Sequence, residues 1–510
     1  MRGDRRLARI GLCLALSVPL AAGAQEQPAS AIPWLSDSLS RQAAPRATEP
    51  PATVVTETTI AVMPLGQTRR DAVGLLSGAL TGLPPDAVAG SDPARLTDLL
   101  MRQPIDALPA MHALTQMLLL AELEPPRAAT DHDALFFARI DSLLRFGALD
   151  QAQALLERAG ATDREAFRRW FDTSLLTGYD TRACDAMTAN PGVAPTLPAR
   201  IFCLTRTGDW AAAALTLETG RAIGAISEEE DRLLAHFLDP DLFEGEPPPV
   251  PPRPMTPLAF RLLDGLGETP STRDLPLAFA VADLRSTIGW KAQIEAAERL
   301  TRIGSLDPNR LLSLYTERRP AASGGVWDRA EAIQKLDAAL LGGQPQAVAN
   351  ALPGAVSRMR DADLLVTFAE FYGSRLMVAD LPPAAETLAL RVGLLSSEYE
   401  TTAQQARAKG MTLQPRDAFA VAIALGEFDA AAPPGGLTQA ISDGLTGAAP
   451  DALLALAGEG RLGEALLQAG LLLANGTGSD PQDIAESLAL LRAVGMQDVA
   501  RRTALQLLLT

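Results

Sequence analysis

The residue types that carry most enzyme chemistry are scarce in this chain. Its histidines are His112, His132 and His236, and its lysines are Lys291, Lys335 and Lys409. The triplet Asp131-His132-Asp133 has donors that could hold a metal ion and activate water. No further His or Cys ligand lies near it, and Asp131 or Asp133 suits the N-cap of the predicted helix 134–146. We therefore expect no metal site, with a metal-dependent hydrolase as the alternative.

Sequence patterns of common catalytic sites are also missing. The chain contains no HExxH, GxSxG, phosphate-binding loop or dinucleotide fingerprint. The acidic run 228–231 lacks the alternating oxygens and central glycine of a calcium loop, and it suits a solvated helix start. Among 61 acidic residues, no spacing singles out a catalytic pair. We expect a non-catalytic protein without a cofactor, and an acid/base hydrolase on a helical scaffold remains open.

Two cysteines, Cys184 and Cys203, predict a structural disulfide. Helices are expected near 180–189 and 199–206, joined by a proline-containing turn at 190–198. Each cysteine lies nine or ten residues from the middle of this turn, so both reach the same height on antiparallel neighbours. Such a pair is oxidised outside the cytoplasm, and two buried free thiols are the alternative.

The segment 314–329 combines arginine, glycine and aromatic residues in a predicted connection between helices. Its candidate interaction residues are Tyr315, Arg318, Arg319 and Trp327. Loops carried by a rigid scaffold are frequent binding elements, which makes this segment the candidate for partner contact. An ordinary loop in which Trp327 anchors the next helix explains the same residues.

The N-terminus predicts export. Residues 1–24 combine four arginines, the short apolar run Ile10–Ala22 and the small residues Ala22-Gly23-Ala24, which is the pattern of a cleaved signal peptide. The apolar run is shorter than the roughly 20 residues that span a membrane, and a retained N-terminal anchor is the alternative. No later stretch is apolar enough to span a bilayer, so we expect an exported protein without a membrane span.

The amino-acid composition indicates the cellular compartment and excludes some classes of partner. Arginine outnumbers lysine strongly, and with abundant Ala and Gly this favours a GC-rich bacterial genome and hence the periplasm. The formal net charge is −16, and it becomes three units more negative when the signal peptide is removed. An acidic surface of this size repels nucleic acid and anionic lipid, so neither is expected as a partner.

The remaining chain is predicted to be helical. Hydrophobic content is 47% but aromatic content only 5%, which favours close-packed helices. From about Arg69, apolar residues recur at i, i+3, i+4 and i+7. We divide the chain as follows: a flexible leader at 25–53, a segment at 54–125 with one strand near 54–62, helical repeats at 126–239, a Pro-rich connector at 240–257 and a second repeat array at 258–510.

An internal repeat underlies this division. A glycine followed five residues later by alanine occurs at Gly147/Ala152, Gly178/Ala183, Gly208/Ala213, Gly342/Ala347, Gly426/Ala431, Gly460/Ala465 and Gly495/Ala500. Each glycine is expected to end a helix in a left-handed conformation, and each alanine to allow close contact one turn into the next helix.

This pattern resembles the tetratricopeptide-like (TPR-like) superfamily of helix–turn–helix repeats, although the family's aromatic positions are mostly absent. The resemblance covers about half of the mature chain and implies an α-solenoid of antiparallel helical hairpins with a concave peptide-binding face. A non-repetitive helical array is the alternative. Together these features predict an exported scaffold that binds envelope proteins in motility, cell-wall synthesis or secretion. A purely structural envelope protein remains possible.

Overall fold

The computed structural model describes residues 69–128, 133–429 and 434–510. Within these ranges the chain forms α-helices and short 3-10 helices (η). The elements are η1 (Arg70–Ala72), α2 (Gly78–Thr81), α3 (Pro93–Arg102), α4 (Pro109–Leu120), α5 (Ala134–Arg145), α6 (Leu149–Ala159), α7 (Arg164–Thr177), α8 (Asp180–Ala189), η2 (Pro191–Val193), α9 (Leu197–Arg206), α10 (Trp210–Ala222), α11 (Glu228–Leu238), η3 (Pro240–Phe243), α12 (Pro257–Gly265), η4 (Leu277–Leu284), α13 (Trp290–Arg302), α14 (Pro308–Glu317), α15 (Val326–Leu341), α16 (Pro345–Arg360), α17 (Leu365–Val378), α18 (Pro383–Gly393), α19 (Tyr399–Ala408), α20 (Pro415–Leu425), α21 (Gly436–Thr446), α22 (Asp451–Gly458), α23 (Leu462–Leu472), η5 (Gly476–Gly478), α24 (Pro481–Ala493) and α25 (Gln497–Leu509).

The predicted all-α class is confirmed. Among the described residues the extended pairing is limited to one isolated bridge, between Leu76 and Ala121. The strand expected near 54–62 lies outside the described residues. No helix in the described ranges is both long and apolar enough to cross a membrane.

The repeated glycines end helices as expected, with one shift. Six of the seven have a positive φ: Gly147, Gly178, Gly208, Gly426, Gly460 and Gly495. At the seventh position the left-handed residue is Gly343, with φ +60°, while Gly342 caps α15 in a helical conformation. The paired alanines Ala152, Ala183, Ala213 and Ala465 are 0% exposed, whereas Ala347 is only partly buried.

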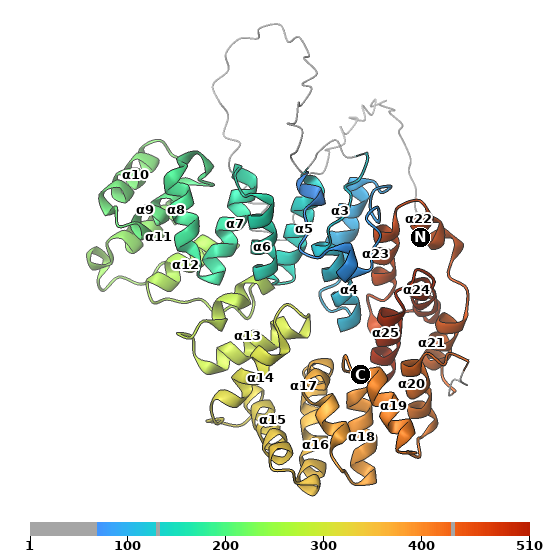
Figure 1. Ribbon diagram of the computed structural model, residues 1–510. Helices are drawn as coiled ribbons and strands as arrows, with labels where there is room; N and C mark the ends of the chain where they lie inside the picture. The colour runs from blue at the N-terminus through green and yellow to red at the C-terminus, as the bar shows by residue number, and fades with distance from the viewer. Residues whose placement is uncertain (1–68, 129–132, 430–433) are drawn as a thin grey trace, which may run out of the picture.

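Most helices that follow one another in the chain pack side by side, whereas α3 packs on α5 and α21 packs on α24, and the chain ends also meet. Figure 1 shows an upper arc from α3 to α10, a lower arc from α13 to α20, and α21 to α25 closing the molecule beside α3 and α4. α23 contacts α3 and α4, and α25 contacts α4 and α20. The ends of the described chain are therefore joined by helix packing.

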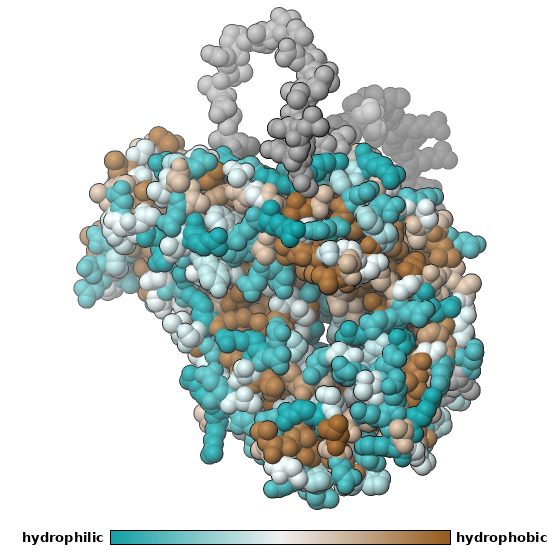
Figure 2. Space-filling view, viewed as in Figure 1, coloured by the Kyte–Doolittle hydropathy of each residue, from teal (hydrophilic) through white to brown (hydrophobic). Residues whose placement is uncertain are grey.

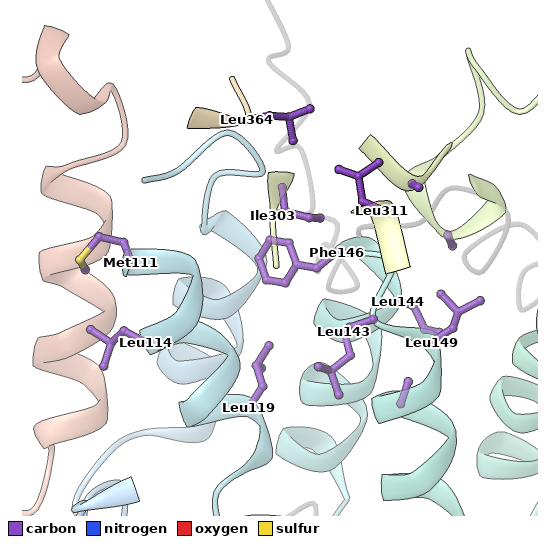
Figure 3. Close-up of a cluster of buried hydrophobic side chains, with 14 of the residues drawn as sticks. Met111, Leu114, Leu119, Leu143, Leu144, Phe146, Leu149, Ile303, Leu311 and Leu364 are labelled. Carbon is purple, nitrogen blue, oxygen red and sulfur yellow. The ribbon is translucent and has the colours of Figure 1, made fainter. Parts of the chain in front are cut away.

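The helices on both sides of the Pro-rich segment share one core. The segment 244–256 contains no helix, yet α12 beyond it packs on α7 and α11, and η4 packs on α5 and α7. Figure 3 shows Phe146 from the α5–α6 turn among Ile303, Leu311 and Leu364 of the later helices. The two predicted arrays thus meet through buried apolar side chains.

Candidate functional site

The two histidines among the described residues, His112 and His236, lie in the separate helices α4 and α11. His112 is 2% exposed, and its Nε2 lies 2.5 Å from the carbonyl oxygen of Ile105. Burial lowers the pKa of His112, which favours the neutral ring. His236 is also buried, with Nδ1 at 2.8 Å from the Arg232 carbonyl and its ring stacked on Phe243. In the described ranges no group of three or more His, Cys, Asp or Glu residues could hold a metal ion.

The start of α5 differs from the sequence interpretation. Asp131 and His132 lie outside the described residues. Asp133 occupies the N-cap position, but its carboxylate makes no capping hydrogen bond and lies 3.1 Å from Arg70. The backbone amide of Phe136 instead donates to Asp71 Oδ1 at 2.8 Å. A carboxylate from a distant 3-10 helix thus caps α5, which sequence neighbourhood could not indicate.

The candidate interaction segment has a buried part and an exposed part. Tyr315 is 0% exposed, and its hydroxyl donates to Glu298 at 2.7 Å. Arg329 holds the same carboxylate with two hydrogen bonds of 2.7 and 2.6 Å. Tyr315 therefore anchors α14 in the core, and a partner cannot reach its side chain.

The rest of this segment lies at the surface. Arg318 and Arg319 are exposed, and Arg318 pairs with Glu317 next to it. Trp327 is half-buried, and its ring centroid lies 5.0 Å from that of Trp290. The structure thus leaves Arg318 and Arg319 accessible, whereas Trp327 anchors α15.

The two cysteines are joined as predicted. Cys184 on α8 and Cys203 on α9 form a disulfide, with 4.9 Å between their Cα atoms. The helices span Asp180–Ala189 and Leu197–Arg206, so the predicted hairpin is confirmed to within two residues. This bond tethers the 190–196 turn, which forms one wall of the cavity described next.

A cavity of about 740 Å³ opens beside this turn. It lies between the N-terminal half of α7 and the first turns of α9, α11 and α12, and sequence analysis did not single it out. Side-chain oxygens of Asp163, Thr196, Ser227 and Thr256 cap these four helices. The cavity is within the range of roughly 300–1,000 Å³ that ligand-binding clefts occupy. We call it the α7–α12 cavity.

Three arginines line the α7–α12 cavity. Arg168 is 6% exposed, and burial lowers the pKa of its guanidinium. Arg164 is exposed, and its Nε and Nη2 each donate to the Ala194 carbonyl at 3.2 Å. Arg200 is exposed on the first turn of α9 and forms no ion pair within the described part of the chain. An accessible cation therefore stands at the mouth of a partly enclosed site.

Two acids, Asp172 and Glu230, also line the cavity. Burial raises the pKa of Asp172 to about 7, although Arg168 and Arg169 act to lower it. Asp172 is thus partly protonated at neutral pH. Glu230 accepts hydrogen bonds from the backbone amide and hydroxyl of Ser227, at 3.0 and 2.7 Å, in a capping box. Its oxygens are committed to the start of α11.

The rest of the lining combines the capping residues Thr196, Ser227 and Thr256 with apolar side chains. These apolar side chains include the buried Phe171 and Ile226, with Leu258 and three prolines of the 191–198 turn region. The sequence signal was present but weak: Arg164, Arg168 and Asp172 recur every four residues along α7. Sequence alone could not show that this face meets the starts of three other helices, since they lie far along the chain: Leu258 on α12 follows Asp172 by 86 residues.

Comparison with known proteins gives no relative. No family model matches the sequence, no curated protein matches it, and no solved structure matches the fold.

Proposed function

We propose that this protein is an exported, periplasmic scaffold of TPR-like helical hairpins that binds other proteins of the cell envelope. The α7–α12 cavity carries the proposal, because it combines accessible and buried arginines with apolar walls. Protein interfaces favour this pairing of arginine with apolar contact, since a guanidinium can bond in several directions while its stem packs.

Exposed apolar side chains on α10 support the same function. Trp210 is 49% exposed, Leu215 69% and Ile223 68%. α10 lies at the end of the upper arc in Figure 1, and Figure 2 shows brown, hydrophobic surface at this end. Large apolar side chains that lie together on an exposed helix favour contact with another molecule.

A crosslinking pull-down of the tagged chain from intact cells, analysed by mass spectrometry, tests this function. We expect one dominant envelope protein for the wild type and its loss for Arg200→Glu. Arg310→Glu is the matched control, because Arg310 is exposed on α14 and lies outside the cavity. An unrelated periplasmic protein serves as the control bait. If the wild type enriches no protein that this control bait does not also enrich, the scaffold function is wrong.

A further inference from the structure

The Pro-rich segment between η3 and α12 is an extended stretch on the surface of the molecule. Residues 247–252 adopt no helix, strand or turn. In the described part of the chain, the backbone of residues 247–254 forms no hydrogen bond. Because proline fixes φ near −65°, a run of prolines favours the polyproline II helix, which needs no internal hydrogen bonds. The carbonyl groups of this segment can therefore accept hydrogen bonds from another molecule.

The burial of this segment follows a period of three residues. Pro249 is buried and Pro252 is half-buried, whereas Pro248, Val250 and Pro251 are exposed. The side chain of Val250 is 75% exposed. A polyproline II helix has three residues per turn, so residues 249 and 252 lie on one face of it. That face packs on the protein, and the other two faces point to solvent.

A spacer between two separate units does not explain these prolines. α12, which follows the segment, packs directly on α11, which precedes it. The segment 244–256 is longer than the roughly 2–8 residues that usually connect packed helices. Only the face with Pro249 and Pro252 packs on the protein. The two outward faces are thus available for contact with another molecule.

The outward residues have the order that a binding groove for polyproline II helices can recognise. Pro248 and Pro251 lie one turn apart, so their rings form a ridge that can stack in an aromatic-lined groove. Arg253 follows, is exposed and forms no ion pair within the described part of the chain, which leaves it available to a carboxylate. Glu244 and Glu246 are exposed at the other end. The opposite charges at the two ends specify the direction in which a groove can bind the segment.

We propose that residues 247–253 are a docking ligand for a protein domain with an aromatic-lined groove and an acidic rim. The groove stacks on Pro248 and Pro251, and a carboxylate of its rim pairs with Arg253. This inference rests on the proposed function and adds a class of partner to it, through residues that do not line the α7–α12 cavity. Because the segment is already extended, binding costs little conformational entropy.

A purified SH3 domain that binds PxxPxR peptides is the probe for this proposal, since its groove has this chemistry. The probe is titrated calorimetrically into the purified chain. A synthetic peptide with the sequence of residues 246–254 is titrated in parallel as the reference. We expect the chain to bind the probe with an affinity within about tenfold of that of the peptide, because the segment is exposed and ordered in the folded chain.

Variants assign the binding to the outward face. Pro248→Ala/Pro251→Ala should weaken binding of the probe at least about tenfold, because each change removes two methylene groups from the contact. Arg253→Gln should weaken it about tenfold through loss of a charge-assisted hydrogen bond. Pro345→Ala, at the exposed start of α16, and Arg310→Gln are the matched controls and should bind as the wild type does. Circular dichroism checks that all variants are folded, as expected for exposed sites.

Three results would overturn the inference. The first is that neither the chain nor the peptide binds the probe. The second is that the chain binds more than about a hundredfold more weakly than the peptide, which would mean that the fold covers the segment. The third is wild-type affinity in Pro248→Ala/Pro251→Ala.

The pull-down from intact cells distinguishes this inference from the proposed function. A partner that is captured equally by the wild type and by Pro248→Ala/Pro251→Ala leaves the scaffold function standing and removes the Pro-rich segment from it. A chain that binds the probe but captures no protein in cells retains the chemistry of the segment and loses the scaffold function.

Discussion

The side-chain carbonyl of Gln506 accepts a hydrogen bond of 3.0 Å from the backbone amide of Ala110, across 396 residues of sequence. Ala110 lies in the first turn of α4, where backbone amides have no partner within the helix. The last helix of the chain thus caps one of the first. Near it, the hydroxyl of Thr503 lies 3.6 Å from the sulfur of Met111, which Figure 3 also shows beside this helix.

Gln506→Ala is expected to lower the free energy of unfolding by about 1–3 kcal/mol. The variant leaves a buried amide without its acceptor and removes a side chain that is 1% exposed. Urea denaturation measures the change. Gln439→Ala, at an exposed site on α21, is the control and should change stability by less than about 0.5 kcal/mol. Equal effects of the two substitutions would show that the contact between α25 and α4 contributes nothing specific.

Gly90→Ala is expected to destabilise a second contact between the two ends of the described chain, in which Gly90 meets the turn before α23. The Gly90 amide donates to the Gly460 carbonyl at 2.9 Å, and an added Cβ would overlap with the Glu459 carbonyl oxygen. Separating these backbones should cost about 1–3 kcal/mol, as in other overpacked sites. Gly458→Ala is the matched control, because it is helical and meets no atom within 4 Å. Thermal melting should place Gly458→Ala at or above the wild type.

Asp71 gives the stability of the protein a specific pH dependence. Burial raises the pKa of this carboxyl from 3.8 to about 6, so the folded state holds the proton more tightly than the unfolded state. Stability contributed by the protonated form is therefore lost as the pH rises from about 4 to about 6. Asp71→Asn cannot ionise but can still accept from the Phe136 amide.

Unfolding at several pH values tests this dependence. Between pH 4 and pH 7, the stability of Asp71→Asn relative to the wild type should increase by up to about 3 kcal/mol, because 1 pKa unit corresponds to about 1.36 kcal/mol. Comparison of the two chains at each pH cancels the contribution of all other acids. A constant difference across this range would contradict the assignment to Asp71.

Loss of the disulfide is expected to lower the free energy of unfolding by about 3 kcal/mol, as the chain-entropy model gives for a loop of this size. The pair Cys184 and Cys203 closes a separation of 19 residues. The double variant Cys184→Ala/Cys203→Ala should match the reduced wild type in calorimetry and show no response to reductant. If the melting temperature of the wild type is the same with and without reductant, the two thiols are free in solution.

Tyr315→Phe separates the two roles of the 314–329 segment. The variant loses the hydrogen bond to Glu298 and should be destabilised by about 1–2 kcal/mol, with partner capture unchanged once it is folded. Arg318→Ala/Arg319→Ala should leave stability within about 0.5 kcal/mol, because both side chains are exposed. Loss of a crosslinked partner in the double arginine variant alone would assign a contact to this loop. If the double arginine variant still captures the partner, the loop serves only to connect α14 and α15.

The sequence by itself determined the features that depend on near neighbours. Helical periodicity, glycine caps such as Gly178 and Gly208, and the Cys184–Cys203 pair all follow from residues within one hairpin. Backbone sterics and the short turn decide such features locally. For the same reason the all-α class could be predicted without an alignment.

Only the tertiary structure decided which helices meet across the chain. The bond between Gln506 and Ala110, the capping of α5 by Asp71 and the convergence of Arg168 with Arg200 each depend on how successive hairpins turn. Small rotations at each turn accumulate along the array, and no local pattern records their sum. The packing also buries Tyr315 while it leaves Arg318 exposed, although the two are only three residues apart. Burial likewise gives Asp71 and Asp172 raised pKa values that their sequence neighbours do not predict.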